Sequence, residues 1–308
     1  MKTSIRRNGF TMIELLFVIV IMGVVGGFAL DTVRQYYENI FRTHEYTKQV
    51  ADADHILEQL SKYFETAINA SIVNLDETNS NTCYGTPGTN NGDFTVAFVA
   101  VDNDSLRGIN GQPGWSEDTL LQNNNILSAP DADYTAADTI ITALYPTSDL
   151  NNSAVYDADS MNVNACTRFN WNGGGTEGYH RITGAPTATT LPLVAGNIAT
   201  DGKQKYLMRT AYAFRVLDNG DFKMYSNFRP WLGETYTDTT TRQNLLGQNV
   251  AHFSIHYNAQ DFQNNANIND RGMIWKLKIC MTGIDANLSE SVSASQQICR
   301  ERSVHVRY

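Results

Sequence analysis

The chain has 308 residues, of which 42% are hydrophobic and 18% are charged, and its formal net charge is −9. This balance is typical of a globular protein with a substantial core, and it excludes a disordered chain. Because Lys2, Arg6 and Arg7 all precede residue 10, the rest of the chain is more acidic still, which argues against a broad nucleic-acid-binding surface.

The first predicted element is an apolar run from Phe10 to Leu30. As a helix it would span about 31 Å, close to the hydrocarbon thickness of a bilayer. The basic residues before it predict a cytoplasmic N-terminus with the rest of the chain outside. A cleaved secretory signal fits poorly, because the run is long and Gly27-Phe28-Ala29 is a poor cleavage site. A plain anchor does not explain Glu14, since an ionisable group in hydrocarbon costs on the order of 2.5–3.5 kcal/mol.

The string Gly9-Phe10-Thr11-Met12-Ile13-Glu14-Leu15 resembles the processing site of type IV prepilins and pseudopilins. The resemblance implies that a prepilin peptidase removes residues 1–9 on the cytoplasmic side and that the new amine of Phe10 is methylated. It also implies that the helix of residues 10–30 stays, first as an inner-membrane anchor and then as the packed centre of a filament. Beyond this segment the resemblance is one of architecture.

Cleavage after Gly9 would give Phe10 a cationic amine, which Glu14 of a neighbouring subunit can pair with. Such a pair would offset the cost of two charges in a dry interface and fix the axial offset between subunits. Gly23, Gly26 and Gly27 would admit close helix approach or local bending. Many family members bend at a proline just after this run, and this chain has none there.

Apolar residues continue at three- and four-residue spacing beyond Leu30, without Gly or Pro, and predict one helix from Phe10 to about Ala70. Its second half is expected to pack an apolar stripe on a sheet, with an independent coiled coil as the weaker alternative. The stripe is formed by Val33, Tyr37, Ile40, Val50, Ala53, Leu57, Leu60, Phe64 and Ile68.

The sequence of residues 71–308 predicts a β-rich body, which is expected to lie outside the membrane. Strands are expected at residues 93–101, 139–145, 212–217, 222–225, 250–257, 275–281 and 298–306. Asn219-Gly220 between two of them indicates a hairpin. Residues 76–92 and 102–137 are expected to be mostly loop, and residues 147–205 a Gly-rich insert. The predicted fold class is therefore α+β: a long N-terminal helix packed on an antiparallel sheet with long loops.

Four cysteines, none spaced as CxxC, follow this export-type segment and favour disulfides over a zinc site or four buried thiols. Four cysteines allow three connectivities. The short intervening loop favours Cys280–Cys299, which leaves Cys83–Cys166.

The last two predicted strands fit this pairing. If Cys280 and Cys299 lie opposite each other in an antiparallel pair, Lys278 faces Glu301 as an opposite-charge pair. The same register would put Trp275 beside Val304.

No catalytic residues are predicted, because the sequence holds no GxSxG, HExxH, P-loop or dinucleotide pattern. His252 and His256 would lie about 13 Å apart on one strand face, too far apart to share a metal. Asp102, Asn103 and Asp104 resemble the start of a calcium loop, but the remaining ligands are missing. No cofactor is expected, with calcium as the open alternative.

The sequence is therefore interpreted as a minor pilin or large pseudopilin, a structural and non-enzymatic subunit. Its expected partners are other pilin-like subunits, the prepilin peptidase, the inner-membrane assembly platform and the membrane. The machine stays open between a pilus, a DNA-uptake filament and type II secretion. The alternatives are a tip adhesin, whose insert at residues 147–205 binds DNA, a surface or secreted cargo, and a membrane-anchored periplasmic enzyme.

Overall fold

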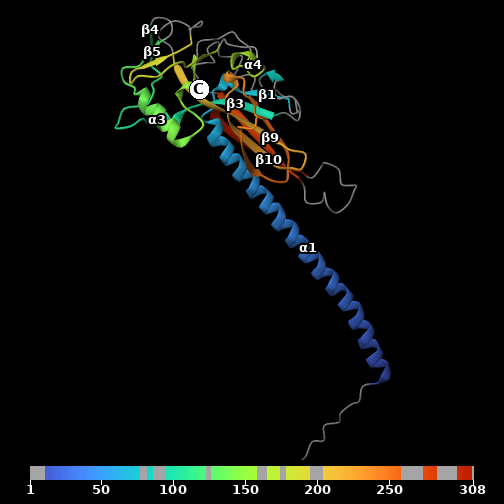
Figure 1. Cartoon of the computed structure of the whole chain (residues 1–308). Coiled ribbons are helices and arrows are strands. Elements are labelled where there is room, and N and C mark those ends of the chain that lie inside the picture. The colour runs from blue at the N-terminus through green and yellow to red at the C-terminus, as the bar shows by residue number, and fades with distance from the viewer. Residues whose placement is uncertain are drawn as a thin grey trace, which may run out of the picture. The chain divides into compact units, whose positions relative to one another are not determined.

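The computed structural model describes residues 11–76, 82–85, 95–122, 126–157, 165–173, 178–194, 204–257, 273–282 and 297–306. A long helix, α1 (Met12–Phe64), is followed by a body of antiparallel strands and short helices, so the fold is α+β as predicted (Figure 1). The chain divides into a first unit, Met1–Val50, and a second, compact unit, Ala51–Tyr308.

The described residues of the body form short helices and three sheets. The helices are α2 (Asn103–Leu106), α3 (Tyr134–Leu144) and α4 (Ala165–Arg168), with 3-10 turns η1 (Asn69–Ser71), η2 (Leu150–Asn152) and η3 (Pro230–Leu232). The strands are β1 (Val73–Leu75), β2 (Cys83–Gly85), β3 (Thr95–Val101), β4 (Leu120–Gln122), β5 (Ile126–Ser128), β6 (Ala154–Asp157), β7 (Tyr179–Arg181), β8 (Thr190–Pro192), β9 (Lys205–Val216), β10 (Phe222–Phe228), β11 (Arg242–Gly247), β12 (Val250–Tyr257), β13 (Met273–Met281) and β14 (Ile298–Val306).

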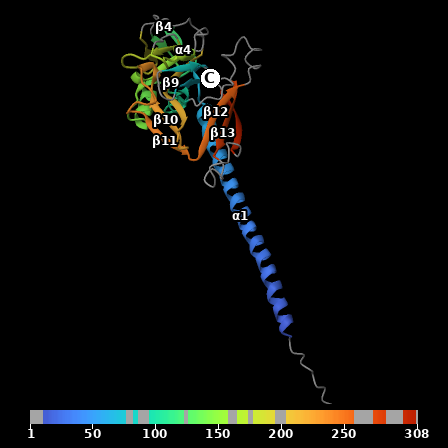
Figure 2. The same cartoon turned by 90° about the vertical axis from the view of Figure 1, so that its right-hand side faces the viewer.

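The largest sheet has 8 strands in the main order β11-β10-β9-β3-β1-β2, with β6 pairing to β9 and β7 to β6. Two smaller sheets follow the orders β12-β13-β14 and β4-β5-β8. The sheet β12-β13-β14, named the C-terminal sheet below, lies beside the last turns of α1 (Figure 2).

The centre of the large sheet is buried on both faces, because a separate apolar core lies against each. Alternate residues of β3 divide between them: Phe98 enters the core shared with α1 and the C-terminal sheet, whereas Val99 enters the core under α3. Phe64 of α1 packs on Phe98 with ring centres 4.6 Å apart. A strand buried on both faces explains the continuous apolar run at residues 95–101, which has no polar alternation.

The hairpin and the C-terminal strand pair form as the sequence predicts. β9 and β10 pair antiparallel across the Asn219-Gly220 turn, where Gly220 has a positive φ of 80° that a glycine adopts without strain. In β13 and β14, Lys278 lies opposite Glu301 and Trp275 opposite Val304.

The strand predicted at residues 139–145 is wrong, because residues 139–144 belong to helix α3 and Tyr145 is its C-cap. Asp133 caps that helix by accepting hydrogen bonds from the backbone N–H groups of Thr135 and Ala136. Tyr134, Ala137 and Ile141 then form a buried stripe at helical spacing. Residues 102–137, expected to be mostly loop, also hold α2, β4 and β5.

Helix α1 ends at Phe64 rather than near Ala70. Ala67 already forms an antiparallel bridge with Ala100, and the backbone N–H of Ile68 donates to the carbonyl oxygen of Val99. The chain therefore leaves the helix to pair with β3 of the large sheet.

Candidate assembly site in the N-terminal helix

The first half of α1 presents apolar side chains on all sides. Its large hydrophobic residues are exposed, from 43% for Val18 to 93% for Met12. The helix is long and apolar enough to cross a membrane, by length and composition. Each exposed Å² of such surface costs about 25 cal/mol in water, so this segment needs lipid or other helices around it.

Glu14 lies in the first turn of α1, where a carboxylate is favoured by the helix dipole. It accepts hydrogen bonds from the backbone N–H and the hydroxyl of Thr11, over 3.4 and 3.3 Å. Both distances are long, so these contacts are weak and Glu14 stays exposed to an incoming partner. Gly9 and Phe10, the predicted cleavage and methylation residues, lie outside the described residues.

The three glycines of the segment are not used for packing within the chain. A Cβ built on Gly23, Gly26 or Gly27 would meet nothing within 4 Å. The helix also continues unbroken through Asp31 and Thr32, whose hydroxyl donates to the carbonyl oxygen of Phe28 over 2.8 Å. One unbroken helix therefore continues beyond Leu30, the last residue of the apolar run.

Residues 31–50, the stem, also keep their large apolar side chains exposed. The predicted sheet-packing stripe is wrong for Val33, Tyr37 and Ile40, which are 50%, 57% and 44% exposed, since the first buried residue of α1 is Ala53. The other exposed aromatic residues of the stem are Tyr36, Phe41 and Tyr46. These side chains have no cover in their own chain among the described residues.

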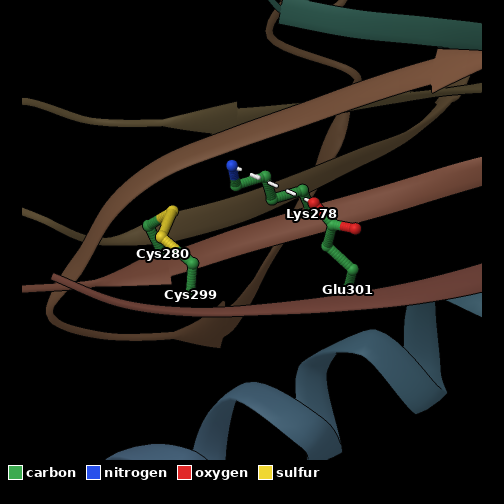
Figure 3. The surroundings of a disulfide bond; sticks show 4 residues. All are labelled: Lys278, Cys280, Cys299 and Glu301. Carbon is green, nitrogen blue, oxygen red and sulfur yellow. Dashed lines mark ion pairs between the residues drawn. A yellow bond between two sulfur atoms is a disulfide. The ribbon is translucent and has the colours of Figure 1, made fainter.

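Two disulfides lie in the body. Cys83 of β2 is joined to Cys166 of α4, and Cys280 of β13 to Cys299 of β14. The second bond links directly opposite positions of neighbouring strands, with Lys278 and Glu301 two residues along and 4.0 Å apart (Figure 3). It therefore fastens β14, an edge strand, to the centre of its sheet.

The calcium-like residues lie in a buried polar cluster. The Asp102 carboxylate accepts a hydrogen bond from the Ser105 hydroxyl, and Asp104 accepts one from the Tyr145 hydroxyl, each over 2.6 Å. Burial raises the pKa of Asp102, and the Ser105 hydrogen bond and the Arg209 charge offset part of that rise. One oxygen of each of these two carboxylates therefore accepts a hydrogen bond from the chain itself.

Arg209 is a residue that the sequence patterns miss. It lies in β9 where the register with β3 shifts, and this irregularity allows its side chain to reach Asp102 and Tyr145. The sequence signal for it is a charged residue within the mostly apolar run from Tyr206 to Phe214, because a buried charge requires a partner. The sequence could indicate the need for that partner but not its identity.

His252 and His256 lie on β12, opposite Cys280 and Lys276 respectively. The two histidines are thus four residues apart along one strand, which is the arrangement that the sequence predicts. Among the residues that the structure describes, no group of three or more His, Cys, Asp or Glu side chains could hold a metal ion.

One comparison with known proteins identifies the N-terminal segment. Residues 5–30 match the family model described as the prokaryotic N-terminal methylation motif. No curated protein and no solved structure matches the chain. The segment is thus of the type IV pilin-family prepilin type, and the motif is one of structural subunits rather than of enzymes.

Proposed function

We propose that this chain is a structural subunit, a minor pilin or large pseudopilin, of a filament assembled from the bacterial inner membrane. The observation that carries the proposal is the combination of the methylation motif with an exposed apolar segment at the start of α1 that is long enough to cross a membrane. A signal that is removed would not need to continue as one helix into the folded body. Here α1 runs from Met12 to Phe64, and its last turns belong to the core.

In this proposal the peptidase cleaves after Gly9 and the amine of Phe10 is methylated. The helix first anchors the chain with its body outside the membrane. During assembly the helix exchanges lipid for neighbouring helices, since both surroundings bury its apolar surface equally well. Glu14 supplies the one specific interaction in that exchange, because a carboxylate among apolar helices selects a cationic partner such as the Phe10 amine.

Mass spectrometry of sheared surface filaments, and of the inner membrane, from the native host tests the proposal. We expect an N-terminal peptide that begins at methylated Phe10, and we expect this chain in the filament fraction at low stoichiometry relative to a major subunit. A chain that begins at Met1, or that is found solely as a membrane protein in cells producing filaments, would contradict it.

A further inference from the structure

Within the residues that the structure describes, three asparagines are exposed and directly precede a glycine. The pairs are Asn110-Gly111, Asn172-Gly173 and Asn219-Gly220. In such a pair the glycine backbone nitrogen can attack the side-chain amide carbon of the asparagine. The amide nitrogen leaves with the glycine proton as ammonia, a succinimide ring closes, and water opens it to aspartate or isoaspartate. Glycine favours this reaction because it has no side chain to hinder the attack and its backbone adopts many conformations.

The pair Asn219-Gly220 is held by hydrogen bonds that the reaction must break. The Gly220 N–H donates to the carbonyl oxygen of Leu217 over 2.8 Å, so the attacking nitrogen is engaged. The Asn219 side-chain oxygen accepts from the backbone N–H of Asp221 over 3.0 Å, and its nitrogen donates to the Asp221 carboxylate over 2.9 Å. Exposure alone therefore does not make this pair reactive, because the hairpin turn between β9 and β10 holds both reacting groups.

The pair Asn172-Gly173 is held less firmly. Its glycine N–H donates to the carbonyl oxygen of Asn170 over 3.1 Å. The attacking nitrogen is thus engaged here as well, so this pair should react more slowly than one whose glycine nitrogen is open.

The pair Asn110-Gly111 has open reacting groups. The two residues form the turn between Ile109 and Gln112, and their φ values of 58° and 84° are both positive, as a type I′ turn requires. The bond that closes this turn runs from the Gln112 N–H to the Ile109 carbonyl oxygen over 3.2 Å, and it does not involve the glycine nitrogen. Neither the Asn110 amide nor the Gly111 N–H forms a hydrogen bond with the described residues. A Cβ built on Gly111 would meet nothing within 4 Å, so the ring has room to close.

We propose that Asn110 is a modification site of the folded protein, converted to aspartate or isoaspartate through a succinimide formed with Gly111. Water is the co-reactant, and the inference is independent of the proposed function. Both products add a negative charge to an exposed turn, and isoaspartate also lengthens its backbone by a methylene group. The turn has little slack for that group, because a Cβ on Gly108 would already clash with the backbone of Gln112. Isoaspartate should therefore loosen the pairing of Ile109 with Gln112.

Peptide mapping by mass spectrometry tests the proposal after incubation of the purified chain in detergent at mildly alkaline pH. In the folded protein the peptide with Asn110 should convert roughly tenfold faster than the peptide with Asn219, since reaction at Asn219 first requires its hydrogen bonds to break. Incubation in heavy-oxygen water labels the new carboxyl group, and so separates this conversion from any that occurs during digestion. Equal rates at the two positions in the folded protein, or a slower rate at Asn110, would overturn the proposal.

The same chain unfolded in guanidinium chloride is the matched control. Unfolding breaks the hydrogen bonds of both turns, and a glycine follows each asparagine, so Asn110 and Asn219 should then convert at rates within about threefold of each other. The gain on unfolding should be large at Asn219 and small at Asn110. If the difference seen in the folded protein persists unchanged after unfolding, the neighbouring sequence rather than the turn geometry sets the rates, and the assignment of Asn110 from the structure fails.

Discussion

The Arg209 guanidinium lies 3.6 Å from the Asp102 carboxylate and 3.3 Å above the centre of the Tyr145 ring. The Asp102 side chain is 1% exposed and that of Arg209 7%, so the pair is shielded from water. Buried ion pairs add little net stability when intact, but the loss of one partner leaves an uncompensated charge.

Arg209→Met should therefore lower the free energy of unfolding by about 3–5 kcal/mol. Asp102→Asn should also destabilise, whereas the double variant should lose clearly less than the sum of the two single losses. Denaturant unfolding of the purified chain in detergent measures all three. Strictly additive losses would show that the two side chains are not energetically coupled.

The same pair predicts a pH dependence. Burial raises the pKa of Asp102 in the folded state, so the folded protein holds this proton to a higher pH than the unfolded chain. The contribution of Asp102 to stability is then full below the unfolded pKa, about 4, and declines as pH rises through the folded value. Asp102→Asn cannot ionise, so its stability relative to the wild type should improve as pH rises above about 4. Parallel stability profiles for the two proteins would contradict this.

Two glycines close together in the chain provide a matched comparison. Gly108 and Gly111 have φ values of +62° and +84°, so alanine is strained at both. A Cβ on Gly108 would also clash with the backbone carbonyl of Gln112, whereas one on Gly111 would enter open space. Gly108→Ala should therefore cost about 2 kcal/mol or more beyond Gly111→Ala in thermal or denaturant unfolding. Equal costs would mean that the turn relaxes freely.

The cysteine pairs predict a redox state. Non-reducing peptide mapping of exported protein should show Cys83 linked to Cys166 and Cys280 linked to Cys299. The first bond closes a separation of 83 residues and the second one of 19. Replacing both cysteines of a pair by serine should thus cost about 4.5 kcal/mol for the first and about 3 kcal/mol for the second in the loop-entropy model. Free thiols, or Cys280 linked elsewhere, would disprove the pairing.

Glu14→Ala tests the assembly role of the carboxylate. The variant should insert and be cleaved normally, because the helix becomes more apolar and the residues at the cleavage site are unchanged. It should be scarce in sheared filaments by on the order of a hundredfold, since an unpaired charge in a dry interface costs about 3–5 kcal/mol. Glu14→Asp, which keeps the charge on a shorter side chain, should be intermediate.

Thr11→Val is the control for this prediction. It removes the hydroxyl contact to Glu14 within the chain but leaves the carboxylate free to pair with a neighbour. It should enter filaments as the wild type does. If Thr11→Val is as scarce in filaments as Glu14→Ala, the role of the carboxylate is to stabilise the N-terminus of its own helix rather than to bind a neighbouring subunit.

Local patterns in the sequence determined the features that depend on near neighbours. The string from Gly9 to Leu15 identified the N-terminal segment. The Asn219-Gly220 turn fixed its hairpin, because few residue pairs adopt the backbone that such a turn requires. Placing Cys280 opposite Cys299 in an antiparallel pair gave the register of Lys278 with Glu301, since one pair of opposite residues sets the register of both strands.

Tertiary structure alone decided what depends on distant partners. The β-branched residues at 139–142 favour a strand in isolation, but a core under Tyr134 and Ile141 makes them a helix. Val33 and Tyr37 recur at helical spacing, as Leu57 and Leu60 do, yet only Leu57 and Leu60 are buried against other elements. Periodicity tells which side chains share a face, whereas the packing of other elements decides whether that face is covered by its own chain or left for another molecule.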